Sequence, residues 1–90
     1  MSNERIAMIR TRLQQALQPL ALEIIDESAK HAGHAGAASG GGHFIVNISA
    51  AAFRDKTPIQ RHRQVYAALE DIMHSEIHAL SINARTPEDT

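Results

Sequence analysis

The segment "HFIVNIS", residues 43–49, decides the fold of this chain. Three apolar side chains at alternate positions, Phe44, Val46 and Ile48, are predicted to point inward. Asn47 lies between two of them and is predicted to point outward. Strict alternation of this kind is typical of a β-strand that buries one face. The chain therefore has a half-buried strand near its centre, and other elements must cover the apolar face of that strand.

Upstream of this strand lies a glycine-histidine loop, residues 29–43, which holds all five glycines and three of the six histidines of the chain. Before the loop, Leu20, Leu22 and Ile24 alternate in the same way and predict another strand. Two strands joined by one loop indicate an antiparallel hairpin. The loop is long for a hairpin, and long loops in compact domains are typically functional or mobile.

Two amphipathic helices are predicted, one on either side of the hairpin. The first ends at Pro19, and its apolar residues recur at steps of three and four: Ile6, Ile9, Leu13, Ala16 and Leu17. The second starts at Thr57 and Pro58, because threonine is a good cap and proline is favoured in the first turn. Its core-facing stripe is predicted to consist of Ile59, His62, Tyr66, Leu69 and Met73, flanked by Val65 and Ile72.

A third strand, "IHALSINA" (residues 77–84), alternates with Leu80 and Ile82 on one side. A right-handed crossover through the second helix should set this strand parallel to the strand at 43–49. The element order therefore predicts an α+β fold, with a three-stranded mixed sheet and helices packed on one face. We expect a single domain over residues 1–90, with a truncated C-terminal helix start at 86–90.

The composition narrows the classes of function. The formal net charge is −1, unlike the basic balance of a dedicated DNA-binding domain. The chain has no cysteine, so neither a disulfide framework nor a site built on its own thiolates is available. No apolar run approaches the length of a membrane span, and the N-terminus lacks the apolar core of a secretory signal. We expect a cytoplasmic protein with no membrane partner.

The histidines are the most informative side chains. His78 begins the third strand in phase with its core-facing side, so its imidazole is expected at the mouth of a cleft. His31 and His34 lie on the glycine-rich loop, from which one of them could swing against His78. Imidazole is the commonest metal ligand, but two histidines alone make an incomplete site. The remaining three have structural interpretations, namely core-edge packing for His62, a solvated strand edge for His43 and a helix end for His74.

Four segments carry a resemblance that runs over essentially the whole chain: "LEIIDES" (22–28), "HFIVNIS" (43–49), "FRDKTPIQRHRQVYAAL" (53–69) and "IHALSINARTPED" (77–89). They are similar to the BolA family. The resemblance implies a KH-like αββαβ fold, in agreement with the element order above. It also implies partnership with a monothiol glutaredoxin that has a CGFS active site, in iron–sulfur cluster trafficking and iron homeostasis.

In such a heterodimer, the resemblance implies a shared 2Fe-2S cluster. The glutaredoxin cysteine and a glutathione thiolate supply sulfur ligands, and the BolA-like chain supplies histidines. His78 matches the ligand at the start of the last strand. The second ligand falls on His31 when counted forward from Glu27, and on His34 when counted back from His43. Both positions stay open.

The alternative function is that of a KH-like nucleic-acid-binding transcriptional regulator. Residues 33–36 spell G-x-x-G, but a KH clamp loop joins two helices, whereas this loop joins two strands. Arg61, Arg63 and Lys56 are the candidate contacts with a partner protein or with nucleic acid, and any DNA binding is expected to be weak. No nucleophile–base pair or paired acid suggests an enzyme.

Overall fold

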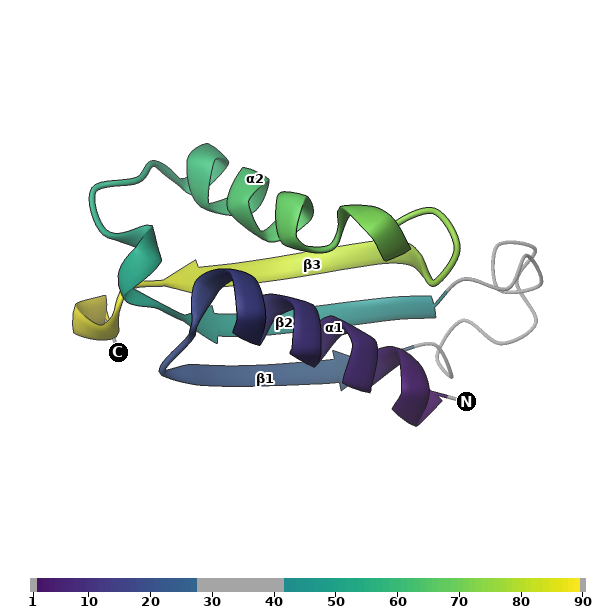
Figure 1. Ribbon diagram of the computed structural model, residues 1–90. Coiled ribbons are helices and arrows are strands. Elements are labelled where there is room, and N and C mark those ends of the chain that lie inside the picture. Colours follow the sequence, from purple (N-terminus) through teal and green to yellow (C-terminus); the bar gives the residue numbers. More distant parts are fainter. Residues whose placement is uncertain (1, 28–41, 90) are drawn as a thin grey trace.

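The computed structural model describes residues 2–27 and 42–89 (Figure 1). The helices are α1 (Ser2–Leu17) and α2 (Pro58–Ala68). The strands are β1 (Ala21–Asp26), β2 (Gly42–Ser49) and β3 (Ile77–Arg85). Single turns of 3-10 helix form η3 (Ala51–Phe53), η4 (Glu70–Ile72) and η5 (Pro87–Asp89). The predicted order of helix, strand, strand, helix and strand is confirmed.

The three strands form one mixed sheet in the order β1-β2-β3. β1 pairs with β2 antiparallel and β2 pairs with β3 parallel, as the sequence predicted. In the middle of the sheet, Val46 pairs with Ile24 on one side and with Ile82 on the other. Because these apolar residues share a register, they form a continuous row across the sheet on the face toward the helices.

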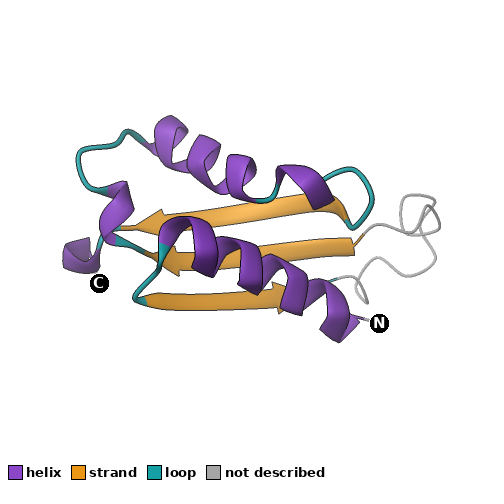
Figure 2. Cartoon of the chain, viewed as in Figure 1, coloured by secondary structure: helices purple, strands orange, loops and turns teal. Residues whose placement is uncertain are grey.

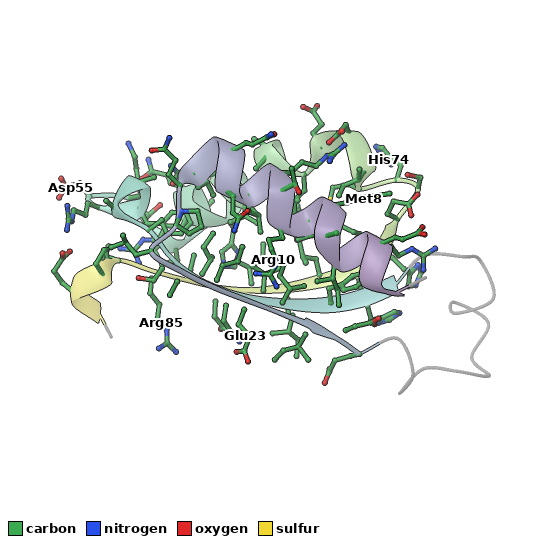
Figure 3. All side chains as sticks on the ribbon, turned by 60° about the horizontal axis from the view of Figure 1, so that its bottom comes forward. Met8, Arg10, Glu23, Asp55, His74 and Arg85 are labelled. Atoms are coloured by element: carbon green, nitrogen blue, oxygen red, sulfur yellow. The ribbon has the colours of Figure 1, made fainter. Side chains whose placement is uncertain are left out.

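Both long helices cover the same face of the sheet (Figure 2). Seen from the side, Glu23 and Arg85 project from the opposite face, which none of the described elements covers (Figure 3). Across this open face, the Asn83 amide donates to the Asn47 Oδ1 at 2.7 Å, and the Asn47 amide donates to the Glu23 Oε1 at 3.0 Å. The fold is therefore a two-layer α+β domain with one apolar interface and one polar face.

The core lies between the helices and the sheet. Its fully buried side chains include Ile9 and Leu13 of α1, Val46 of β2 and Phe53 of η3. Burying one side chain of this size contributes about 1.5–3 kcal/mol to stability. The alternation predicted for β2 is confirmed, because Phe44, Val46 and Ile48 are all buried.

The start of α2 follows the prediction. The Thr57 hydroxyl accepts a hydrogen bond from the Gln60 backbone N–H, and the Gln60 side chain accepts one from the Thr57 N–H. Pro58 occupies the first turn, where its missing N–H costs no helical hydrogen bond. This reciprocal cap fixes where the helix begins.

The predicted core stripe of α2 is correct only at its C-terminal end. Ile59 is 65% exposed and Tyr66 is 41% exposed, and His62 is exposed as well. Leu69 of the predicted stripe is buried, and so are Val65 and Ile72, which were predicted to flank the stripe.

Polar anchors explain this orientation of α2. The Arg61 guanidinium donates to the Ala84 carbonyl of β3 at 3.3 Å, and the Gln64 amide donates to the Ala52 carbonyl at 3.1 Å. Both anchors turn the side of the helix that carries Val65 toward the sheet. The packing role expected for His62 is therefore excluded.

Ion pairs connect the helices to the turns. The Arg12 guanidinium of α1 donates to both carboxylate oxygens of Asp71 in η4, at 2.7–2.9 Å. These hydrogen bonds lower the pKa of the Asp71 carboxyl below its ordinary value. At the far end of the sheet, Arg54 binds Glu88 of η5, the single turn where the sequence predicted a truncated helix start. No helix within the described ranges is long and apolar enough to cross a membrane.

Candidate metal-binding site

His78 lies at an irregularity in the pairing of β2 with β3. Gly42 pairs with Ile77, but the next residue, His43, pairs with Ala79, so His78 is an extra residue in β3. Such a bulge interrupts the alternation of side chains and redirects the residue that it contains. Ile77 is buried, and both His78 and Ala79 are exposed. The sequence placed His78 in phase with the core-facing side, and the bulge is the reason that this prediction is wrong.

The start of β3 is firmly anchored despite the bulge. The Glu76 carbonyl accepts a hydrogen bond from the Gly42 N–H at 3.1 Å, and the Glu76 N–H donates to the Ile72 carbonyl at 3.0 Å. The Glu76 carboxylate also accepts from Arg5 Nε of α1 at 3.2 Å. Contacts from β2, η4 and α1 therefore fix the residue two positions before His78, and the exposed imidazole projects from a well-supported backbone.

His43 is the neighbour of His78. The two imidazole rings have centroids 5.0 Å apart, with an angle of 41° between their planes. The sequence predicted a solvated strand edge for His43, but the residue is half-buried and lies beside the candidate ligand. One signal could have revealed this. Parallel strands start at the same end of a sheet, so histidines at the starts of two neighbouring parallel strands should meet.

The separation of the two rings suits a shared metal ion. A metal bound to an imidazole nitrogen at about 2.1 Å lies about 3.2 Å from the ring centroid, and two imidazoles in tetrahedral arrangement then have centroids about 5.2 Å apart. The observed separation is 5.0 Å. The separation of the two ring centroids is therefore close to that of two imidazoles bound to one metal ion.

Two imidazoles do not complete a metal site. Across residues 2–27 and 42–89, no group of three or more histidine, cysteine, aspartate or glutamate side chains is arranged to hold a metal ion. A hollow of about 250 Å³ adjoins His43, and its lining residues are Glu27, His43, Phe44, Ile45, Ala79 and Ser81. Further ligands must come from elsewhere, and the exposed side of His78 leaves room for them to approach.

The predicted loop ligands His31 and His34 lie outside the described residues. The described residues on either side of the segment that contains His31 and His34 lie at the same end of the sheet as His43 and His78. The Glu27 N–H donates to the His43 carbonyl at 2.8 Å, and Gly42 starts β2. Glu27 and Gly42, the described residues on either side of this segment, therefore lie at the same end of the sheet as His43 and His78.

The basic candidates are not brought together with the histidines. Arg61 donates to the Ala84 carbonyl, close to the end of β3 that is opposite His78, and to the Lys56 carbonyl at 3.0 Å. Its guanidinium therefore supports the fold. Lys56 and Arg63 are exposed and border a hollow of about 290 Å³ together with Gln60 and Gln64. Lys56 and Arg63 are available for contact with a partner, which stays a prediction.

Known proteins resemble the chain in both sequence and structure. A family model described as "BolA-like protein" matches residues 13–89. BolA-like protein 1 from Bos taurus is 46% identical over 81 residues, covering 90% of this chain and 58% of the relative. The DNA-binding transcriptional regulator BolA from Escherichia coli (strain K12) is 35% identical over 83 residues, covering 88% of this chain and 76% of the relative.

A solved structure agrees with these relatives. The BolA domain of SufE1 from Arabidopsis thaliana superimposes with a TM-score of 0.81 at 41% identity, covering 93% of each chain. The chain spans only 58% of the length of the Bos taurus relative. The similarity therefore concerns this domain and does not extend to the rest of the longer protein.

Proposed function

The chain belongs to the BolA-like family, and we propose that it is an adaptor in iron–sulfur cluster trafficking and iron homeostasis. In this proposal it forms a heterodimer with a monothiol CGFS glutaredoxin and supplies histidine ligands to a shared 2Fe-2S cluster. The glutaredoxin cysteine and glutathione supply the sulfur ligands. The observation that carries the proposal is the close placement of His43 and His78 on a chain without cysteine.

The donor set of this chain fits half of such a site. His78 is exposed, so a metal already held by a partner can reach its imidazole. The second nitrogen ligand comes from His31 or His34 in the proposal based on resemblance, and His43 is the further candidate that its distance of 5.0 Å from His78 supports. Imidazole in place of thiolate removes negative charge from a 2Fe-2S cluster and raises its reduction potential, as in Rieske centres.

The chain acts in this scheme as an adaptor and not as an enzyme. Its residues hold ligand nitrogens at a fixed end of a rigid sheet, and the bulge at His78 turns one imidazole outward. A ligand from a second protein would have to approach along the same end. The role of the fold is therefore to orient two imidazoles toward a partner while the polar anchors of Glu76 hold the strand in place.

Reconstitution tests the proposal directly. The protein is mixed with a CGFS glutaredoxin, glutathione, ferrous iron and sulfide, and the visible absorption and circular dichroism are recorded together with gel filtration. We expect the two proteins to comigrate and the visible circular dichroism to differ from that of the glutaredoxin homodimer. A spectrum identical to that of glutaredoxin alone, without comigration, would reject the adaptor function.

The second candidate is a KH-like nucleic-acid-binding regulator of transcription. Two observations favour it: Lys56 and Arg63 are both exposed on the same hollow, and the Escherichia coli relative is named as DNA-binding. The commitment of Arg61 to two backbone carbonyls and the net charge of −1 weaken it. Gel shift with duplex DNA over a range of salt concentrations would distinguish this candidate, because the salt dependence of the affinity measures how many phosphates the protein neutralises.

A further inference from the structure

The outward side of α2 carries large apolar residues that the fold does not use. Ile59 and Tyr66 are 65% and 41% exposed, although the core of the domain is otherwise well covered. They are seven residues apart, which places them on the same side of the helix and about 10.5 Å apart along its axis. Exposed apolar side chains that line up in this way indicate an interaction surface, and tyrosine is enriched among binding hot spots.

Basic groups lie between and beside these apolar residues. Arg63 and His62 lie between Ile59 and Tyr66 in the sequence and are exposed, and Lys56 precedes the helix. The helix itself, Pro58–Ala68, contains no acidic residue. Neither Lys56 nor Arg63 takes part in an ion pair in the described part of the chain, so both charges can meet a ligand. We call Ile59, His62, Arg63 and Tyr66 the α2 ridge.

A hollow next to the ridge provides room for an apolar anchor. It measures about 390 Å³ and is bordered by Tyr66, Ala67, Glu70, Met73 and His74. An apolar side chain from a partner that entered it would contact the Tyr66 ring. Because aromatic residues in partly enclosed pockets contribute most of the binding energy of many interfaces, Tyr66 is the expected centre of this one.

A second copy of the chain does not fit the ridge. A two-fold antiparallel pairing that seats Ile59 of one copy on Tyr66 of the other would bring Arg63 of each copy against His62 and Arg63 of the other. Basic groups would then face each other across the interface. A nucleic acid would use the charges of the ridge and leave Ile59 and Tyr66 without an apolar partner.

We propose that the α2 ridge binds an acidic amphipathic helix of another protein. The helix presents two apolar residues seven positions apart, one for Ile59 and one for Tyr66, with carboxylates between them that face Arg63. This surface is on the helical side of the domain, whereas His43 alternates with the buried Phe44 in β2 and therefore lies on the other face of the sheet. The proposal goes beyond the adaptor function and does not depend on it.

A designed peptide tests the proposal with the full chain. The probe is an alanine-rich, fluorescently labelled peptide of about 18 residues, with two leucines seven positions apart and glutamates between them. Its matched control carries lysines in place of the glutamates. We expect the acidic peptide to bind and the basic one not to bind, in fluorescence anisotropy. Absence of measurable binding of the acidic peptide at about 1 mM protein would overturn the proposal.

Variants of exposed residues locate the binding surface without unfolding the domain. Tyr66→Ala should weaken binding at least about tenfold. Arg63→Glu should weaken binding of the acidic peptide and allow the basic peptide to bind. The controls are Leu20→Ala, at an apolar residue that is 74% exposed outside α2, and Arg85→Glu on the open sheet face; both should leave the Kd unchanged.

Two results would contradict the assignment to the ridge. The first is an equal loss of peptide binding in the Leu20 and Tyr66 variants, because nonspecific apolar contact would explain it. The second is competition by duplex DNA for the same surface, with a DNA affinity that depends on Arg63 but not on Tyr66. The surface would then be a phosphate-binding one. A Tyr66→Ala protein that no longer binds the peptide but still assembles the shared cluster would show that the two proposals concern different surfaces.

Discussion

Replacing His78 separates a metal ligand from a structural residue. His78 is exposed and sits in a bulge, and its side chain is not part of the core. Exposed substitutions of this kind change stability by no more than about 0.5 kcal/mol. His78→Ala should therefore leave the unfolding of the free protein nearly unchanged, as measured by urea or thermal denaturation.

The effect on the shared cluster should be much larger. Loss of even an outer-shell partner of a metal ligand weakens metal binding about 10–100-fold, so loss of a direct ligand should weaken the heterodimeric cluster at least as much. The visible spectrum should also move toward that of a site with only sulfur ligands. The measurement is visible circular dichroism of the reconstituted heterodimer during titration with a chelator.

Parallel variants identify the second nitrogen. His43→Ala should match His78→Ala if the ring pair at 5.0 Å forms the ligand set. His31→Ala or His34→Ala should match it if the loop supplies the ligand, and His43→Ala should then have little effect. His62→Ala is the matched control, since His62 is exposed on α2. If His78→Ala leaves the spectrum and the chelator resistance unchanged, the assignment of nitrogen ligands is wrong.

Three further predictions test the fold and the alternative function. Leu69→Ala removes a fully buried side chain and should destabilise the domain by about 2–5 kcal/mol in urea unfolding, whereas Tyr66→Ala should not. A larger loss of stability in Tyr66→Ala than in Leu69→Ala would refute the orientation of α2. Asp71→Asn should lower the Tm slightly near neutral pH. Because Arg12 lowers the pKa of folded Asp71, the pair stabilises the fold fully above the ordinary carboxyl pKa of 3.8. The difference in Tm should shrink below that value and vanish once the pH has fallen through the lower pKa of the folded state. A difference that persists in acid would exclude the ion pair as its cause. Duplex DNA should bind weakly, and its affinity should depend only slightly on salt, because few phosphates can be neutralised. Arg63→Glu should reduce this DNA affinity. Tight, sequence-selective binding at physiological salt would favour the regulator function.

The order of elements and the topology of the sheet followed from the sequence because they depend on strong local patterns. Alternation in β2 and the Thr57–Pro58 cap are each set by a few neighbouring residues. The orientation of α2 did not follow, because two apolar stripes compete along the same helix. Arg61 and Gln64 settle that competition through carbonyls of β3 and η3, which are distant in sequence.

The candidate site could be predicted only in part for a similar reason. His78 was identified from its place at the start of a strand, but its direction depends on a bulge that alternation alone does not reveal. The contact with His43 depends on which residues of β2 and β3 are paired. The contribution of His31 and His34 stays a prediction, because both residues lie outside the described part of the chain.

The residues proposed for the two candidate activities lie near opposite ends of β3. His78 is at the start of the strand, and Ala84, whose carbonyl binds Arg61, is six residues further on. At about 3.3 Å per residue, this places the histidine pair about 20 Å from the anchored base of the basic region. Substitutions at one end therefore should not disturb the other. His78→Ala should weaken cluster binding and retain whatever DNA binding exists, and Arg63→Glu should reduce DNA binding and leave the cluster unaffected. A variant that abolished both activities with an intact fold would mean that one surface serves both partners.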